Sequence, residues 1–324
     1  MLSNHRICLL ALLSAALGAA CKSTPAGTSN CAAAPQQSPI GAPCPGFGAP
    51  VQTGSIDASN LLEISGIAAS RTVPGAFYVH NDSDDGPRFY AIDASGRLLA
   101  AFELTGAAAV DYEDIAVGAS NGRTFVYIGD TGDNGARDGS VAPRGEIQVY
   151  RVPEPNFPRV PDLAQYAIGF ERLRLSYPDR PHDSEALLFD SIRSQLILIS
   201  KEDRGVATVF EVPPDVTPDT PTTLVPRGPV VIGSCNGPTT GVVTGADISP
   251  DGRNIVLISY GLISLWQRSV TESVADALGR PAQFTATLGA PNAEAITFAP
   301  DGRSWYATTE GANAPLLKAT LNCP

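Results

Sequence analysis

The chain has 324 residues, of which 43% are hydrophobic and only 17% charged, so it is long enough to bury one large core. Its formal net charge is −11, which argues against nucleic acid and anionic membrane surfaces as partners. The acidic balance favours cationic partners or a metal ion, although such a balance often serves only solubility. The 31 glycines and 28 prolines suit a domain of short strands and tight turns.

The first twenty residues have the pattern of an export signal. His5 and Arg6 precede an apolar stretch from Ile7 to Ala20 that is too short to span a bilayer as a stable helix. Small residues lead to Cys21 and resemble a bacterial lipoprotein signal, in which this cysteine is acylated and becomes the mature N-terminus. The alternative is simple secretion with Cys21 free or paired. We expect a signal peptide at 1–20, a lipidated flexible tether at 21–50 and a folded domain at 51–324.

One pattern occurs five times in the folded domain. An apolar strand begins with Glu, Asp, Ser or Thr, and a second strand follows about ten residues later and stops at a polar cluster. The five units begin at Glu63, Tyr112, Ser184, Thr244 and Ala293. Third strands follow in every unit and fourth strands in all but the last, which predicts an all-β propeller with five four-stranded blades. Six blades are the alternative because the interval after the second unit is long, but the surplus there is rich in proline.

The missing fourth strand of the last unit has a candidate at the start of the domain. The segment from Val51 stands ahead of the first unit without a partner, so we expect it to complete the last blade and close the ring. Closure would bring Cys44 close to Cys323, and we expect a disulfide between them because export leads to an oxidising compartment. Cys31 with Cys235 would follow by elimination, but Cys235 could equally be a free buried thiol.

Polar residues gather in the loops that precede the first strand of each unit and in those that join its second and third strands. In a four-stranded meander these loops lie on the same face, which we call the working face. Carboxylates that converge at a channel mouth must be protonated, paired with cations or bound to a hard metal, and oxygen ligands suit calcium better than zinc or copper. The candidate metal ligands are Glu63, Glu113, Asp114, Glu185 and Glu294. The alternative is that the glutamates only accept hydrogen bonds from backbone amides of the neighbouring blade.

The same face supplies candidate ligand-binding residues. They are His80, Asp82, Asp130, Asp133, Arg137, His182, Lys201, Glu202 and Glu310. The two histidines are the only ones after the signal, and each could orient a phosphate, act as a base or bind metal. Lys201, Arg137 and Arg204 could meet an anionic substrate or could simply neutralise adjacent acids. The acidic loops NDSDDG and DTGDNG lack the spacing and the distal glutamate of an EF-hand.

Several of these short motifs resemble one group of propellers. ISG, YEDIA, SEAL and AEAI at the first strands, with GDTGDN and SKEDR at the ends of second strands, are similar to the SdiA-regulated propellers and the broader phytase-like and esterase-like group. The resemblance covers roughly residues 60 to 312. It implies a β-propeller, export to the periplasm or cell surface, and a metal ion such as calcium near the channel, at Glu113, Glu185, Glu294 and Glu63.

Two classes of function follow. The first is a calcium-binding propeller displayed on the envelope as a binding or scaffold module, a monomer that binds a ligand or protein on its acidic face. The second is a metal-dependent hydrolase of phosphoesters or other esters, in which a carboxylate-held cation activates water and Lys201 or Arg137 stabilises the developing anion. No GxSxG, HExxH or P-loop pattern is present, and the fold alone does not decide between the classes.

Overall fold

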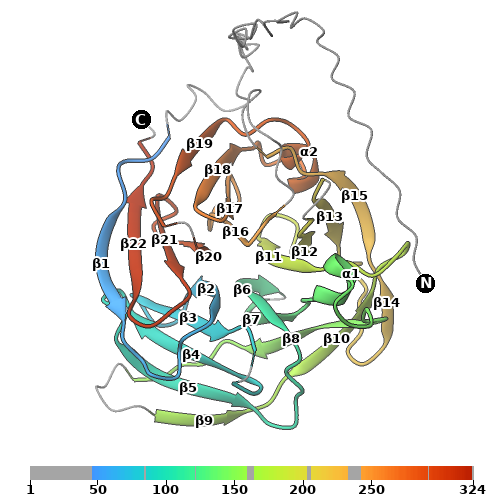
Figure 1. The fold of residues 1–324 in the computed structure, drawn as a ribbon, viewed down its shortest axis with the longest axis horizontal. Helices are drawn as coiled ribbons and strands as arrows, with labels where there is room; N and C mark the ends of the chain where they lie inside the picture. Colours follow the sequence, from blue (N-terminus) through green and yellow to red (C-terminus); the bar gives the residue numbers. More distant parts are fainter. Residues whose placement is uncertain are drawn as a thin grey trace, which may run out of the picture. The chain divides into compact units, whose positions relative to one another are not determined.

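Five sheets surround a central axis like the blades of a propeller (Figure 1). The computed structural model of the protein describes residues 46–83, 85–120, 122–158, 164–202, 206–232, 242–290 and 292–322. The prediction of a five-bladed all-β propeller is confirmed, and the six-bladed alternative is wrong. Each blade contains a meander of four antiparallel strands, and two blades carry one further strand at an outer edge.

The strands of each blade follow in chain order. Blade 1 comprises β2 (Ile64–Ala69), β3 (Ala76–Asn81), β4 (Arg88–Asp93) and β5 (Leu98–Leu104). Blade 2 comprises β6 (Tyr112–Ser120), β7 (Arg123–Asp130), β8 (Ile147–Pro153) and β10 (Glu171–Ser176). Blade 3 comprises β11 (Ser184–Asp190), β12 (Gln195–Ser200), β13 (Thr208–Glu211) and β15 (Val225–Pro229). Blade 4 comprises β16 (Gly245–Ile248), β17 (Asn254–Ser259), β18 (Leu262–Gln267) and β19 (Phe284–Thr287).

Blade 5 is completed by the N-terminal strand, as predicted. Its strands are β20 (Ala293–Phe298), β21 (Ser304–Thr309), β22 (Ala314–Thr320) and β1 (Val51–Ile56), and β1 pairs antiparallel with β22. The contact between the ends of the domain begins before β1, because Phe47 forms a bridge with Leu321 and packs edge-on against Trp305. The last residues of the predicted tether, from Gly46 onward, therefore pack on this blade.

The first strands form the ring around the axis, and each contacts the first strands of the neighbouring blades. All residues of β2, β11 and β20 are buried, because the blades enclose them on both sides. This is why apolar residues fill consecutive positions in these strands, such as 186–189 of β11, instead of alternating with polar ones. Packing between blades is tight: a Cβ on Gly118 of β6 would lie 2.1 Å from a ring carbon of Phe189 on β11.

Two strands and two short helices were not predicted. β9 (Ala164–Ile168) pairs in parallel with β5, and β14 (Pro221–Thr223) pairs in parallel with β10, so each extends a blade at its outer edge. The short helices α1 (Asn134–Asp138) and α2 (Val274–Leu278) lie in loops of blades 2 and 4. β9 accounts for part of the long interval between the second and third units.

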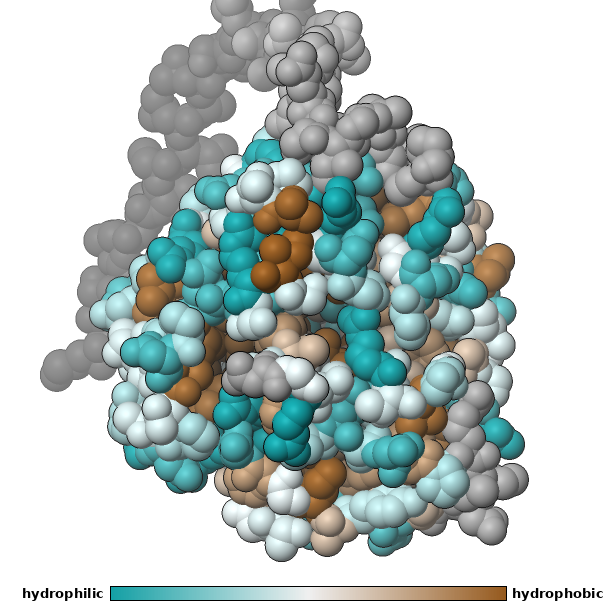
Figure 2. Space-filling model, turned by 180° about the vertical axis from the view of Figure 1, so that it is seen from behind, coloured by the Kyte–Doolittle hydropathy of each residue, from teal (hydrophilic) through white to brown (hydrophobic). Residues whose placement is uncertain are grey.

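Several predictions concern residues outside the described part of the chain. They are the signal peptide, lipidation at Cys21, the Cys44–Cys323 disulfide, Cys31, Cys235 and Arg204. Among the described helices, none has the length and apolar character needed to cross a bilayer. On the face of the propeller seen in Figure 2, hydrophobic residues form separate small groups among hydrophilic ones.

Candidate functional site

A polar cavity of about 190 Å³ lies at the channel mouth on the working face. Its lining comes from all five blades: Ser65, Asp82, Glu113, Asn134, Arg137, Glu185, Lys201, Tyr260, Glu294 and Glu310. The expected convergence of the polar loops is therefore observed. The lining has five carboxylates against two cations, a formal excess of three negative charges when all are ionised.

Irregular strand pairing explains why the aligned positions reach this cavity. The pairs β2–β3, β6–β7, β11–β12 and β20–β21 each have a register shift near the start of the first strand. The residues within these shifts are Ser65, Glu113 with Asp114, Glu185 and Glu294. A β-bulge leaves an extra residue outside the ladder and re-aims its side chain. A repeated bulge thus directs one side chain from each of four blades to the channel mouth.

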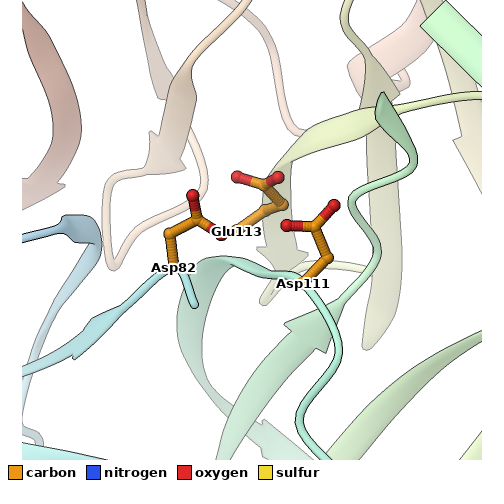
Figure 3. A group of neighbouring side chains, drawn as sticks. All are labelled: Asp82, Asp111 and Glu113. Carbon is orange, nitrogen blue, oxygen red and sulfur yellow. The ribbon is translucent and has the colours of Figure 1, made fainter. Parts of the chain in front are cut away.

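Three carboxylates from blades 1 and 2 form a group that we call the acidic triad: Asp82, Asp111 and Glu113 (Figure 3). Asp82 follows β3, Asp111 immediately precedes β6, and Glu113 lies within β6. One oxygen of each side chain lies within 4.8 Å of the others. Among the described residues, no lysine or arginine forms an ion pair with the triad. This side of the cavity therefore lacks a counter-charge from the protein.

Neighbouring polar and small residues hold the triad close. The Ser65 hydroxyl donates a hydrogen bond to Oε2 of Glu113 at 3.1 Å. A Cβ on Gly132 would lie 2.3 Å from Glu113 Oε1 and 2.5 Å from Asp111 Oδ2. Only glycine leaves room for both carboxylates there, which gives a physical reason for the second glycine of the GDTGDNG loop.

The opposite side of the cavity is charge-compensated. Arg137 Nη1 lies 3.5 Å from Asp183 Oδ2 and 3.5 Å from Glu185 Oε1. The Lys201 ammonium donates to both oxygens of Glu185, and the Asp133 amide donates to Asp183 Oδ1 at 2.8 Å. We call Asp183 and Glu185 the paired carboxylates. With Glu113 they also form a group close enough to hold a metal, but protein cations already contact two of the three.

Burial raises the pKa values of the cavity carboxyls. Desolvation raises the pKa of Asp82 to about 8, and the nearby charges of Asp111 and Glu185 contribute. Burial, with the charge of Glu185, places the pKa of Glu113 well above its usual value. Burial also raises the pKa of Glu294 to about 8, whereas that of Glu185 reaches only about 7 because Lys201 opposes the effect. Near neutral pH the triad side therefore holds protons unless a cation replaces them.

Lys201 stays charged in this setting. Burial alone would lower the pKa of its ammonium, but the Glu185 carboxylate outweighs burial and raises that pKa above its usual range. Lys201 Nζ also lies 5.1 Å from the centroid of the Tyr260 ring, within the range of a cation–π interaction.

Asp114, a predicted metal ligand, does not line the cavity. Its oxygens accept hydrogen bonds from the amides of Ile115 and Leu187, each at 2.8 Å, so it links blade 2 to blade 3. Asp247 of blade 4 acts similarly, since it accepts from the Phe298 amide of blade 5 at 2.8 Å. We call these two buried aspartates the interblade aspartates. The alternative proposed for the glutamates, hydrogen bonding to a neighbouring blade, thus applies to these aspartates.

Neither histidine lines the cavity. His80 is fully buried, donates from Nδ1 to the Asn81 carbonyl at 2.9 Å, and has a pKa lowered to about 4 by burial. His182 packs against aromatic rings, and its two ring nitrogens lie 3.1 Å from Glu202 Oε1 and 3.2 Å from Asp179 Oδ1. Both side chains are held in place by neighbours outside the cavity lining.

Four other predicted residues also lie outside the cavity lining. Asp130 pairs with Arg144 at 2.9 Å, and Asp133 caps the first turn of α1. Glu202 pairs with Arg180 as well as His182, and Glu63 is exposed and accepts a hydrogen bond from Ser83. Of the predicted residues, those that line the cavity are Asp82, Glu113, Arg137, Glu185, Lys201, Glu294 and Glu310.

The candidate site residues chosen from the sequence did not include Asp111, Asp183, Arg144 or Tyr260, although Asp111 and Asp183 were expected in the polar loops of the working face. Asp111 and Asp183 each precede a cavity glutamate by two residues, so the repeated spacing Asp-x-Glu was an available signal. Tyr260 had no such signal, because its position depends on how blade 4 packs beside Lys201.

The sequence matches no protein-family model, and no curated protein is significantly similar to it. The resemblance to SdiA-regulated and phytase-like propellers therefore stays a prediction. What is established is the five-bladed propeller and the arrangement of its acidic mouth.

Proposed function

We propose that this chain is an exported, envelope-displayed propeller that binds calcium at the acidic triad and acts as a binding or scaffold module. The observation that carries the proposal is the contrast in counter-charge across the cavity. Arg137 and Lys201 contact the paired carboxylates, whereas no described cation contacts Asp82, Asp111 or Glu113. A hard divalent cation would supply the missing charge.

The ligand chemistry favours calcium over softer metals. The triad offers only carboxylate oxygens, and the Ser65 hydroxyl stands beside it. Calcium accepts several oxygen ligands in variable geometry, whereas zinc and copper favour nitrogen and sulfur. The proposed site shares Glu113 with the set expected from the sequence but uses Asp82 and Asp111 in place of Glu63, Asp114, Glu185 and Glu294.

The hydrolase alternative receives less support from the geometry. It needs Lys201 or Arg137 to stabilise an anion, but Lys201 contacts both oxygens of Glu185 and Arg137 lies between Asp183 and Glu185. An anionic substrate would have to compete with those buried carboxylates for each cation.

Calcium titration of the chelator-treated mature protein tests the cation site. We expect the melting temperature to rise with calcium, because a ligand that binds only the folded state stabilises it by about 2.7 kcal/mol at 100 times its dissociation constant. Magnesium at the same concentration serves as the comparison ion. A melting temperature that does not respond to either ion would refute the proposed site.

Fractionation of cells that express the Cys21→Ala variant tests envelope display. We expect the substituted protein to leave the membrane fraction while its melting temperature stays unchanged, because the acyl chain would be the anchor. Retention in the membrane fraction after a salt wash would contradict lipidation at this residue.

A further inference from the structure

Most of the exposed large hydrophobic side chains among the described residues lie on the face that holds the acidic cavity. The described part of the chain has eight large hydrophobic residues that are exposed, and five of them lie in working-face loops. These five, which we call the apolar rim, are Leu62, Val110, Val141, Val206 and Tyr260. Each lies before a first strand or between the second and third strands of its blade. The face that holds the acidic cavity thus also carries most of the exposed large hydrophobic side chains in the described part of the chain.

Tyr260 joins the rim to the cavity. It forms, with Gly261, the turn between β17 and β18, and the φ angles of the two residues are 42° and 85°. Such a turn is best suited to Asn-Gly, and a bulky side chain at positive φ is unusual. The tyrosine is nevertheless 48% exposed and lines the cavity, with its ring 5.1 Å from the Lys201 ammonium.

The surroundings of Lys201 show that this half of the cavity accommodates a primary ammonium group. Its primary ammonium is held by the Glu185 carboxylate and lies near an aromatic ring. Glu294 lines the same cavity and is only 9% exposed, yet no described lysine or arginine forms an ion pair with it. Glu310 lies beside it in the lining, on the loop after β21. With all carboxyls of the lining ionised, a divalent cation at the triad would still leave the lining with net negative charge.

We propose that the working face docks a segment of a partner protein that presents a lysine between apolar residues. The lysine ammonium would enter the cavity beside Glu294 and Glu310, and its apolar neighbours would cover the rim. This inference rests on the proposed role as a binding module and specifies the chemistry of the partner. The acidic cavity is complementary in charge to a lysine ammonium, and the exposed apolar rim is complementary to apolar residues on either side of that lysine.

Fluorescence anisotropy with synthetic peptides tests the inference on the mature protein in calcium. The probe is a fluorescein-labelled heptapeptide with a central lysine flanked by leucine and valine. The comparison peptides carry N-acetyl-lysine at the centre, or lysine flanked by glycine and serine. We expect each change to weaken binding at least about tenfold, a loss of about 1.4 kcal/mol. Equal binding of the acetylated peptide, or of the glycine and serine peptide, would overturn the proposal.

Variants of the protein test where on the working face the lysine peptide binds. Glu294→Gln should weaken binding of the lysine peptide at least about tenfold but not that of the acetylated peptide. Tyr260→Asn removes the ring while keeping a residue that tolerates positive φ, and should also weaken binding. The matched control is Glu103→Gln, at an exposed position on β5. Loss of binding in the control equal to that in Glu294→Gln would also overturn the proposal.

Calcium melting curves recorded on the same proteins separate the two hypotheses. A wild-type protein that responds to calcium but does not prefer the lysine peptide would refute the docking inference and leave the cation site standing. A protein that prefers the lysine peptide but does not respond to calcium would support docking and refute the cation site.

Discussion

Glu113 and Asp114 are neighbours in β6, yet they belong to two different regions of the channel. Asp114 lies with Asp247 among the interblade aspartates, where backbone amides of adjacent blades donate to the carboxylate oxygens. Glu113 lies at the mouth with Asp82 and Asp111, where no described cation pairs with the triad. A buried carboxylate is tolerated where the fold supplies donors. Where it does not, protons or a bound cation must supply the missing charge.

Removal of an interblade aspartate should give the largest effect on stability. Asp114→Ala leaves the buried amides of Ile115 and Leu187 without their acceptor. We expect the free energy of unfolding to fall by roughly 2 to 5 kcal/mol, measured by urea denaturation. The calcium-dependent rise in melting temperature should persist, because this side chain does not line the cavity. A folded Asp114→Ala protein that no longer responds to calcium would contradict the division into two regions.

Removal of a triad carboxylate should reduce the response to calcium without lowering the stability of the calcium-free protein. Asp111→Asn keeps the size of the side chain but removes one anionic ligand, so the stabilisation of about 2.7 kcal/mol at saturating calcium should shrink. Without calcium the variant should be no less stable than the wild type, because a source of repulsion is gone. Melting curves with calcium and with chelator measure both quantities.

The control for this variant is Glu171→Gln, on the outer strand β10, where Glu171 is exposed and pairs with Arg151. We expect its calcium response to equal that of the wild type. An equal loss of response in the Asp111 and Glu171 variants would mean that calcium acts through overall charge rather than at the triad.

Much of the fold could be predicted because its information is local. The apolar runs of the first and second strands and the turns between them gave five blades, and the unpartnered segment at Val51 gave the closing strand. The parallel edge strands β9 and β14 could not be predicted, since five and three residues with weak patterning pair with strands distant in the sequence. Their existence depends on the tertiary fold.

The site could be placed on the correct face but could not be resolved residue by residue. Loop composition and strand alternation indicated a cluster of acids at the channel mouth, which the cavity lining confirms. The sequence could not distinguish Glu113 from Asp114, because the bulge that separates their directions arises from pairing with β7. Nor could the sequence show that Lys201 and Arg137 would neutralise carboxylates on only one side of the cavity.

The pH dependence of stability should sharpen the same contrast. Burial raises the pKa values of Asp82 and Glu294 to about 8, so between about pH 4 and pH 8 the folded state binds more protons than the unfolded state. This stabilising contribution is complete below the unfolded pKa values and is lost as the pH rises through the folded ones. In chelator, we expect the free energy of unfolding to fall across this range, by about 1.4 kcal/mol for each unit by which folding raises a carboxyl pKa, measured by urea denaturation.

Calcium should oppose this fall, because the cation replaces the protons that the triad would otherwise hold. The calcium-dependent rise in melting temperature should therefore be larger at pH 8 than at pH 5.5, where protons compete for the same oxygens. The interblade aspartates accept backbone amides instead, so calcium should leave their part of the pH dependence unchanged. In Asp111→Asn the pH profile of stability with calcium should approach the profile with chelator. A calcium effect that is independent of pH in the wild type would place the cation away from the buried carboxyls of the channel mouth.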